Sequence, residues 1–258
     1  MTDTEVVIPT RNAPAILWLT LTHLFAFNRR DVAGVTLLDN RSDAPGADAV
    51  LAWAASQGCL VVRHERNVGV WASVNRGLAL ARSRRVLVLT SDVLLGQRAV
   101  QALAAIMDAV DVPFLGPEVL TGLAAAPALA VPLPETGGVD TSQYNGACWM
   151  MDRERLLAEV GWFDPRFCVA YGDTDYVERM RLADVRYGVV RGVPCVHLDK
   201  QSRRAEHTVE EDTEMEIRDG GRFHEKWAAY PEILTRHPAV SRQAYLYAKQ
   251  GWKEAIPQ

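Results

Sequence analysis

Short β-branched runs alternate with longer Ala- and Leu-rich segments through the first half of this chain. Four runs are predicted strands, at Glu5–Pro9, Val35–Asp39, Leu60–His64 and Val86–Thr90. The segments between and after them have helical periodicity, and the predicted helices are Pro14–Phe27, Ala47–Gln57, Val70–Ala81 and Gln97–Ala109. Strands that alternate with helices are typical of βαβ units. The sequence therefore predicts an α/β fold with a mostly parallel central sheet flanked by helices.

The regular alternation of predicted strands and helices ends in the second half of the chain. Strands are expected at Val112–Pro117, Gly146–Met151 and Tyr187–Leu198, helices at Arg153–Val160 and Asp175–Ala183, and a surface loop at Thr121–Gly138. From Lys200 the composition turns polar, and the acidic run Glu206–Glu216 is typical of a solvated helix face or a mobile segment. We predict one domain over residues 1–199 and a polar, mostly helical extension over 200–258.

Composition narrows the class of protein. With 48% hydrophobic and 23% charged residues in 258, the chain has the averages of a globular protein. Its net charge of −4 argues against a protein that binds nucleic acid through an overall positive charge. The most apolar run, Ala13 to Phe27, is shorter than the roughly 20 residues that span a membrane. We therefore expect a globular protein without a membrane span.

The cysteines show no metal-binding spacing. Neither a C-x-x-C pair nor a Cys/His cluster occurs among Cys59, Cys148, Cys168 and Cys195, and three of the four have apolar neighbours. Such residues are expected to be buried thiols in a reducing compartment. The first residues also lack a basic segment followed by an apolar one, so no signal peptide is expected. The prediction is a cytoplasmic protein.

Polar residues follow each predicted strand directly. They are Thr10-Arg11-Asn12, Asp39-Asn40-Arg41-Ser42, Arg66-Asn67, Ser91-Asp92 and, after a late strand, His197. Ligands of open parallel sheets bind beyond the carboxyl ends of the strands, so these side chains are candidates for a polar, phosphorylated ligand. The alternative is that they only cap helices and form turns. Neither G-x-G-x-x-G after the first strand nor a P-loop is present, which argues against dinucleotide oxidoreductases and P-loop hydrolases.

Read in order, these segments resemble the GT-A family 2 glycosyltransferases. The resemblance covers roughly Glu5 to His197. It rests on Val6–Asn12, Leu37–Asp43, Asn67-Val68-Gly69 with Asn75-Arg76-Gly77, Leu87–Val93, Gly146–Glu154, Val160–Phe167, Tyr171–Tyr176 with Arg179, and His197. It implies a GT-A, Rossmann-like sheet, with residues 1–117 binding a nucleotide sugar and 118–199 forming a smaller catalytic and acceptor-side region.

The resemblance assigns roles to individual residues. Asp39 would hydrogen-bond the edge of the base, most often uracil, whose imide N–H a carboxylate accepts. The other nucleotide contacts would be Pro9, Thr10, Asn12, Asn67, Gly69, Asn75 and Ser91. Asp92 and His197 would bind Mn²⁺ or Mg²⁺, which bridges the two phosphates. Asp173 would be the base that removes the proton of the acceptor hydroxyl. Contacts to sugar or acceptor are expected from Trp149, Trp162 and Asp175.

Two departures from the family pattern matter. The usual D-x-D metal motif reads Thr90-Ser91-Asp92, so it offers one carboxylate where many members have two. Gly172 stands where Glu normally precedes the catalytic Asp, which removes a like charge that would raise the pKa of Asp173. Asp175 would restore that charge only if the turn brings the two carboxylates together. Simpler alternatives are that Asp173 and Asp92 cap helices and that His197 is a core histidine.

The resemblance implies an inverting glycosyltransferase that moves a sugar from a nucleoside-diphosphate sugar, UDP- or dTDP-linked by preference, to a hydroxyl acceptor such as a saccharide. Three alternatives stay open: a nucleotide-sugar-binding protein without turnover, a sugar nucleotidyltransferase, and an enzyme that glycosylates a modified nucleic-acid base. The last would draw on local basic stripes, which are Arg82, Arg84 and Arg85, or Lys200, Arg203 and Arg204. The sequence does not decide the oligomeric state.

Overall fold

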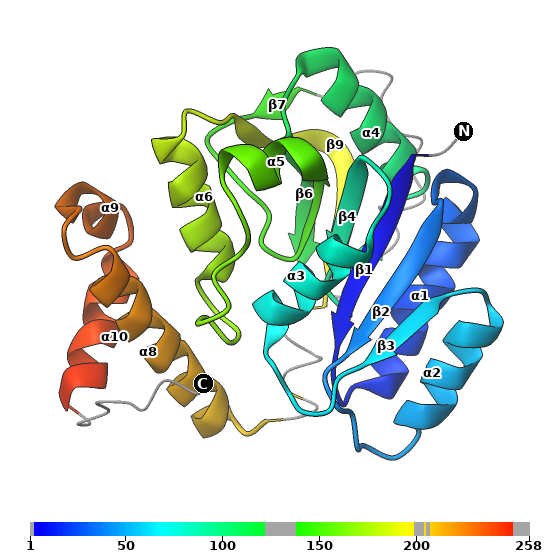
Figure 1. Cartoon of the computed structure of the whole chain (residues 1–258), viewed down its shortest axis with the longest axis horizontal. Coiled ribbons are helices and arrows are strands. Elements are labelled where there is room, and N and C mark those ends of the chain that lie inside the picture. Colours follow the sequence, from blue (N-terminus) through cyan, green and yellow to red (C-terminus); the bar gives the residue numbers. More distant parts are fainter. Residues whose placement is uncertain (1–2, 122–137, 199–203, 205–206, 250–258) are drawn as a thin grey trace.

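A computed structural model describes residues 3–121, 138–198, 204 and 207–249. Its centre is one sheet with the strand order β3-β2-β1-β4-β8-β6-β9-β5, and β7 pairs with β9 outside this path. The first four strands are all parallel, as the alternating pattern predicts (Figure 1). They are β1 (Thr4–Thr10), β2 (Gly34–Asp39), β3 (Leu60–Arg63) and β4 (Arg85–Leu89).

The second half of the sheet is mixed. Strand β8 (Cys148–Asp152) runs antiparallel between β4 and β6 (Phe114–Thr121), and β6 is parallel to β9 (Tyr187–His197). Two short strands that the sequence analysis did not predict, β5 (Val93–Leu95) and β7 (Val139–Asp140), pair antiparallel with β9. The α/β, GT-A-like architecture is confirmed, and parallel pairing dominates only its first half.

Helices cover both faces of the sheet (Figure 1). Alternate β1 residues explain this, because Val6 and Ile8 belong to one apolar cluster and Val7 to the other. The first cluster takes its helical residues from α1 (Pro14–Asn28), α2 (Ala47–Ser56) and α4 (Ala99–Val110). The second takes them from α3 (Val70–Leu80), α5 (Arg153–Glu159), α6 (Gly172–Leu182) and the C-terminal helices. A short 3₁₀ helix, η1 (Arg29–Asp31), follows α1.

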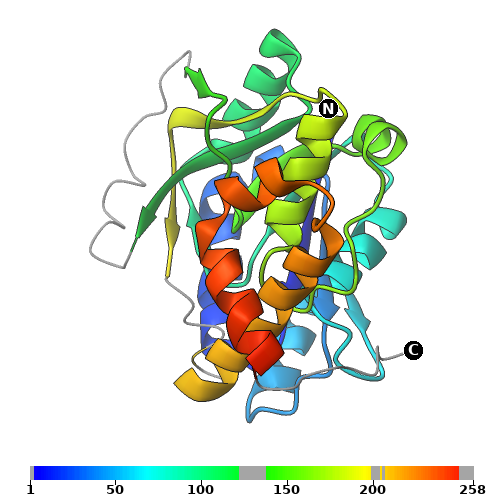
Figure 2. The same ribbon diagram turned by 90° about the vertical axis from the view of Figure 1, so that its left-hand side faces the viewer.

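The C-terminal extension is joined to the second cluster. It comprises α8 (Val209–Lys226), α9 (Pro231–Arg236) and α10 (Pro238–Lys249), with α8 and α10 packed side by side (Figure 2). The sequence places Phe223, Trp227 and Tyr230 at helical spacing, which predicts packing; Phe223 and Trp227 are buried, and Tyr230 is exposed. The acidic run lies partly on α8, which begins with a capping box between Thr208 and Glu211. The domain boundary near residue 200 stays a prediction.

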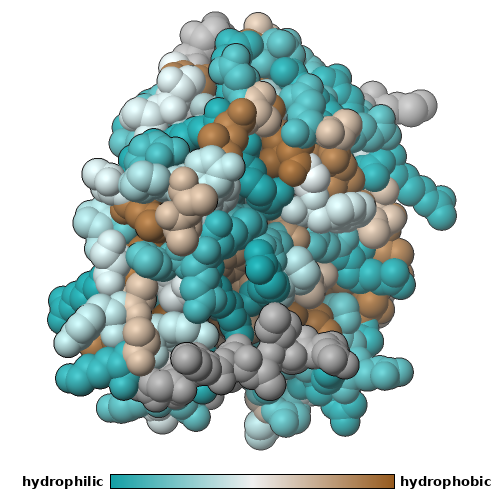
Figure 3. All heavy atoms as spheres, turned by 60° about the vertical axis from the view of Figure 1, so that its left-hand side comes forward, coloured by the Kyte–Doolittle hydropathy of each residue, from teal (hydrophilic) through white to brown (hydrophobic). Residues whose placement is uncertain are grey.

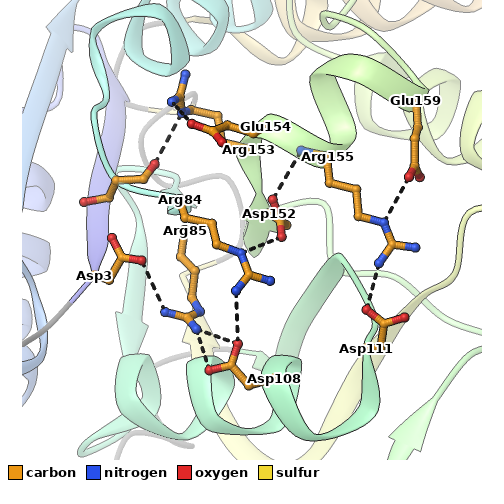
Figure 4. Close-up of polar contacts among 11 residues, drawn as sticks. Asp3, Arg84, Arg85, Asp108, Asp111, Asp152, Arg153, Glu154, Arg155 and Glu159 are labelled. Atoms are coloured by element: carbon orange, nitrogen blue, oxygen red, sulfur yellow. Dashed lines mark hydrogen bonds and ion pairs between the residues drawn. The ribbon is translucent and has the colours of Figure 1, made fainter.

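An ion-pair network lies around the amino end of β4, at the opposite end of that strand from Thr90 and Asp92 (Figure 4). The Asp152 carboxylate accepts from Arg84 Nε at 2.8 Å and caps α5 at the Arg155 N–H. Arg85 pairs with Asp108 and Asp3. Arg84 and Arg85, two of the three arginines in the first basic stripe, are thus paired with carboxylates. This pairing weakens the alternative in which the stripe binds nucleic acid. Lys200 and Arg203 lie outside the described residues.

Helix α6 differs most from its prediction, since it begins at Gly172 rather than Asp175. Its N-cap residue, Tyr171, has φ of 58°, and its side chain does not cap the helix, so no sequence signal marks this start. The expected loop at 121–138 lies almost wholly outside the described residues. Within the described part of the chain, no helix is both long and apolar enough to cross a membrane.

Candidate active site

A cavity of about 1580 Å³ lies beyond the carboxyl ends of the parallel strands. One side of it is formed by residues that follow β1, β3 and β4, and the other by α8 and the segment before α6. The face that carries the C-terminal helices is largely hydrophilic with scattered apolar side chains (Figure 3). Small-molecule pockets usually measure about 300–1,000 Å³, so this cavity has room for two ligands side by side.

Asp92 and His197 lie together at one wall of the cavity. Strand β5 pairs antiparallel with the end of β9, so Val93 is opposite His197 and the Leu198 N–H donates to the Asp92 carbonyl at 2.9 Å. The His197 Nε2 atom is 3.4 Å from Asp92 Oδ1. Carboxylate and water oxygens suit Mn²⁺ and Mg²⁺, and His197 would add an imidazole nitrogen to the ligands. The described residues contain no group of three or more His, Cys, Asp or Glu side chains that could hold a metal ion, so further ligands would be phosphates and water.

Asp173 lies in the first turn of α6, against a glycine of the cavity wall. A Cβ atom added to Gly146 would collide with Asp173 Oδ2, and Gly146 lines the cavity. Burial raises the pKa of the Asp173 carboxyl, while hydrogen bonds from Thr174 and from the Asp173 backbone oppose the shift. A carboxylate with a raised pKa, next to a cavity, is a candidate general base.

The position of Gly172 is explained by Trp71 of α3. The indole of Trp71 lies so close to Gly172 that any Cβ there would collide with it. Trp71 also stacks on Trp149 at 5.9 Å and on Phe163 at 5.2 Å between ring centroids. An aromatic cluster therefore takes the space of the glutamate that the family pattern places before the catalytic Asp.

Asp175 does not join Asp173. It is fully buried, and its carboxylate binds Arg179 at 3.0 Å, Lys226 Nζ at 2.7 Å and Trp227 Nε1 at 3.1 Å. The helical turn places it toward α8 rather than toward the cavity. The expected contact of Asp175 with a sugar is corrected to an ion pair that holds two helices together.

Five of the predicted nucleotide contacts line the cavity: Pro9, Thr10, Asn67, Gly69 and Ser91. The loop before α3 is held by Asn40, which accepts from the Val68 N–H at 3.3 Å and from Ser73 Oγ at 2.9 Å. Gly69 has φ of 83°, and a Cβ there would press on the Cys168 backbone. Glycine thus permits both the turn and the close approach of two loops.

Three other predicted nucleotide contacts lie outside the cavity wall. The Asn12 side chain accepts from the Asp43 and Ala44 N–H groups. Asn75 exchanges two hydrogen bonds with the Phe163 backbone. Asp39 is fully buried, where it accepts from Ser42 and pairs with Arg63 Nε at 3.0 Å. In this structure these side chains hold loops in place, because their hydrogen-bonding groups are used within the protein.

The two predicted tryptophan contacts differ. Trp149 is buried and lines the cavity. Trp162 is 47% exposed and does not line the cavity, so the structure does not favour it as a platform for a sugar.

Arg11 and Arg66 line the nucleotide side of the cavity. The sequence predicted both among the polar residues that follow strands, but the family resemblance gave neither of them a role. Three further cavity residues were not predicted. Arg218, Arg222 and Lys226 line the opposite side. Their spacing of four residues places them on one face of α8, a signal present in the sequence.

Comparisons with known proteins bear on the family and on the fold. Residues 5–116 match the model of a family described as Glycosyl transferase family 2. No curated protein sequence matches the chain significantly.

Solved glycosyltransferase structures share the fold. A mannosyltransferase from Pyrobaculum calidifontis in complex with GDP-Man and Mn²⁺ has a TM-score of 0.64 at 18% identity, over 95% of this chain and 70% of that one. TarS of S. aureus, residues 1–349 in complex with UDP, has a TM-score of 0.62 at 14% identity, over 86% of this chain and 72% of that one.

GalNAc-T7 with UDP, GalNAc and Mn²⁺ has a TM-score of 0.58 at 14% identity, over 76% of this chain. The chain spans 43% of the length of GalNAc-T7 and 43% of the longer TarS structure. The first half of the chain is thus similar in sequence to glycosyltransferase family 2, and the chain as a whole shares the GT-A fold of these solved glycosyltransferases.

Proposed function

We propose that this protein is an inverting glycosyltransferase, which moves a sugar from a nucleoside-diphosphate sugar to a hydroxyl acceptor. One observation carries the proposal: the candidate base and the candidate metal ligands adjoin the same stretch of the cavity wall. Asp173 lies against Gly146, and the next carbonyl, of Ala147, accepts from the Thr90 N–H at 2.9 Å. Thr90 is two residues from Asp92, which neighbours His197.

Each group has a defined task in a direct displacement. The Asp173 carboxylate takes the proton of the acceptor hydroxyl as its oxygen attacks the anomeric carbon, and the bond from that carbon to the diphosphate breaks. The configuration at the anomeric carbon inverts, since attack and departure occur on opposite sides. Asp92 and His197 would hold Mn²⁺ or Mg²⁺, whose charge stabilises the departing diphosphate.

The donor is proposed to be a UDP- or dTDP-sugar, as the sequence suggests. Two of the structural neighbours contain UDP and one contains GDP-Man, so a guanine donor is the competing choice. Arg11 and Arg66, on the nucleotide side of the cavity, supply positive charge for a diphosphate. The opposite side, formed by α8, is where we place the acceptor. Free thiols at all four cysteines fit a reducing compartment such as the cytoplasm.

A thermal-shift series with UDP, dTDP, GDP, CDP and ADP, each with and without Mn²⁺, tests the donor site. A ligand that binds only the folded state raises the free energy of unfolding by RT ln(1 + [L]/Kd), and the Tm rises with it. We expect one diphosphate to raise the Tm, with a larger rise when Mn²⁺ is present. A series in which no diphosphate changes the Tm would contradict a nucleotide-sugar site.

Turnover is then measured with the sugar donor of the base identified. Asp173→Asn should abolish transfer and donor hydrolysis while the nucleotide still raises the Tm. Asp184→Asn is the matched control, because Asp184 is an exposed carboxylate just beyond the other end of α6 and adopts a left-handed φ of 54° that Asn tolerates. Full activity of the Asp173→Asn variant would disprove the role of the base.

A further inference from the structure

Asp219 of α8 is a buried carboxylate that holds the segment in front of the candidate base. Its Oδ2 atom accepts from the N–H groups of Val169 at 2.8 Å, Ala170 at 2.9 Å and Cys168 at 3.1 Å. The residue is fully buried. Three backbone donors converging on one carboxylate give charge-assisted hydrogen bonds, which are about twice as strong as neutral ones. This contact therefore fixes the path of residues 168–170.

Other bonds fix the same segment from two further directions. Arg222, one turn after Asp219, pairs with it at 3.0 Å and donates to the Arg166 carbonyl at 2.8 Å. The Cys168 carbonyl accepts from the Val70 N–H at 2.9 Å. Val70 begins α3, directly after the loop of Asn67 and Gly69 that forms the nucleotide side of the cavity. The peptide of Cys168 thus joins the nucleotide side to the acceptor side.

The segment leads directly to Asp173. Tyr171 caps α6 in a left-handed conformation, and Asp173 follows in the first turn. On the far side of Asp173, the carboxylate of Asp175 is bound by Lys226 and Trp227, at the end of α8. Helix α8 therefore holds the chain both before and after the candidate base, while Met215, Arg218 and its other inward residues line the cavity.

We propose that Asp219 is a positioning residue for the glycosyl transfer reaction: it holds residues 168–170 so that Asp173 faces the acceptor bound along α8. This inference rests on the proposed function. Asp219 acts through Asp173 and does not itself take a proton from the acceptor. Because a misplacement of about 1 Å in a reacting group costs about a hundredfold in rate, loss of this hold should affect kcat more than donor binding.

The test compares Asp219→Asn with Glu214→Gln. Glu214 is an exposed carboxylate on the same helix, so its substitution removes the same charge without touching residues 168–170. Asparagine at 219 keeps the shape and one accepting oxygen, but it loses the negative charge, and its NH₂ group donates where the second carboxylate oxygen accepted. Donor hydrolysis, nucleotide Kd and backbone amide exchange are measured for the wild type and both variants. We expect Asp219→Asn to lower kcat by about 10- to 100-fold with KM and Kd for the donor within about twofold.

Hydrogen exchange of the backbone amides tests the contact of Asp219 with residues 168–170 without a measurement of activity. In the wild type, the amides of residues 168–170 should exchange slowly, and Asp219→Asn should speed them while Glu214→Gln leaves them unchanged. Faster exchange with an unchanged kcat, or unchanged exchange in Asp219→Asn, would overturn the proposal. A parallel loss of Tm and nucleotide binding would assign Asp219 a purely structural role and also overturn it. A wild type that binds no nucleotide would instead refute the proposed function, and the exchange data would still report the contact.

Discussion

The indole of Trp71 occupies the space that any side chain at position 172 would need. The two residues come from different helices, α3 and α6, yet they meet beside the candidate base. Asp173 therefore stands without the carboxylate that the family pattern places before it. Its raised pKa comes first from burial rather than from a like charge.

Substitution of Gly172 by Ala should destabilise the protein by about 1–3 kcal/mol, because the added methyl group overpacks a filled aromatic cluster. Trp71→Ala alone should cost about 3–5 kcal/mol, since it leaves a cavity. In the double variant the methyl group no longer meets the indole, so the two costs should not add. Denaturant unfolding of the four proteins of this double-mutant cycle measures the coupling. Strict additivity would show that the two positions are independent.

A side chain at Gly146 should reduce activity much more than stability. Ala at this position would push against the Asp173 carboxylate, so we expect kcat to fall about a hundredfold. Gly138→Ala is the matched control, because no atom of the described residues lies within 4 Å of the Cβ position there. Both variants are compared by donor hydrolysis and by Tm. Equal activity of the two variants would argue against Asp173 as the base.

The acid limb of the pH–rate profile should lie above the ordinary Asp pKa of 3.8. Burial raises the pKa of Asp173, and a base must be deprotonated to act, so kcat/KM should fall as the pH drops through this raised value. The profile of kcat/KM reports the free enzyme. An acid limb at or below pH 3.8, with the protein still folded, would contradict this assignment.

Stability at low pH should depend on Glu178. This buried carboxylate of α6 accepts hydrogen bonds from Arg236 and His237, beside α9, and its pKa is lowered from 4.5 to about 2. A lowered pKa stabilises the folded state above the unfolded value of 4.5, and that contribution is lost as the pH falls from 4.5 toward 2. The shift corresponds to about 3 kcal/mol.

Glu178→Gln removes this contribution and leaves the cations beside it uncompensated. We expect a lower Tm at pH 7 and a smaller difference from the wild type near pH 2, with the exposed Glu214 as the site of the control substitution Glu214→Gln. A constant difference in Tm between pH 7 and pH 2 would show that Glu178 contributes by packing alone.

Local sequence determined the elements of the first half and the order of the site segments. The β-branched runs predicted the ends of β1 to β4 to within one or two residues. This works because strand propensity and burial depend on a few neighbouring residues. Polar residues that directly follow parallel strands are expected at the carboxyl edge of the sheet. This rule predicted that Thr10, Asn67 and Ser91 lie at the same edge, and all three line the cavity.

Tertiary structure decided the rest. Asp173 and Asp175 are two residues apart and of the same residue type, yet Asp173 lies against Gly146 of the cavity wall and Asp175 lies inside an ion-paired cluster with Lys226. Several contacts of the site join residues that lie about 50 or more positions apart in the sequence. Trp71 packs on Gly172, the Asp219 carboxylate accepts from the Cys168 N–H, and residues of α8 line the cavity opposite the strand ends. The sequence determines which groups are present. Which of them meet depends on packing between distant segments, and no local pattern records that packing.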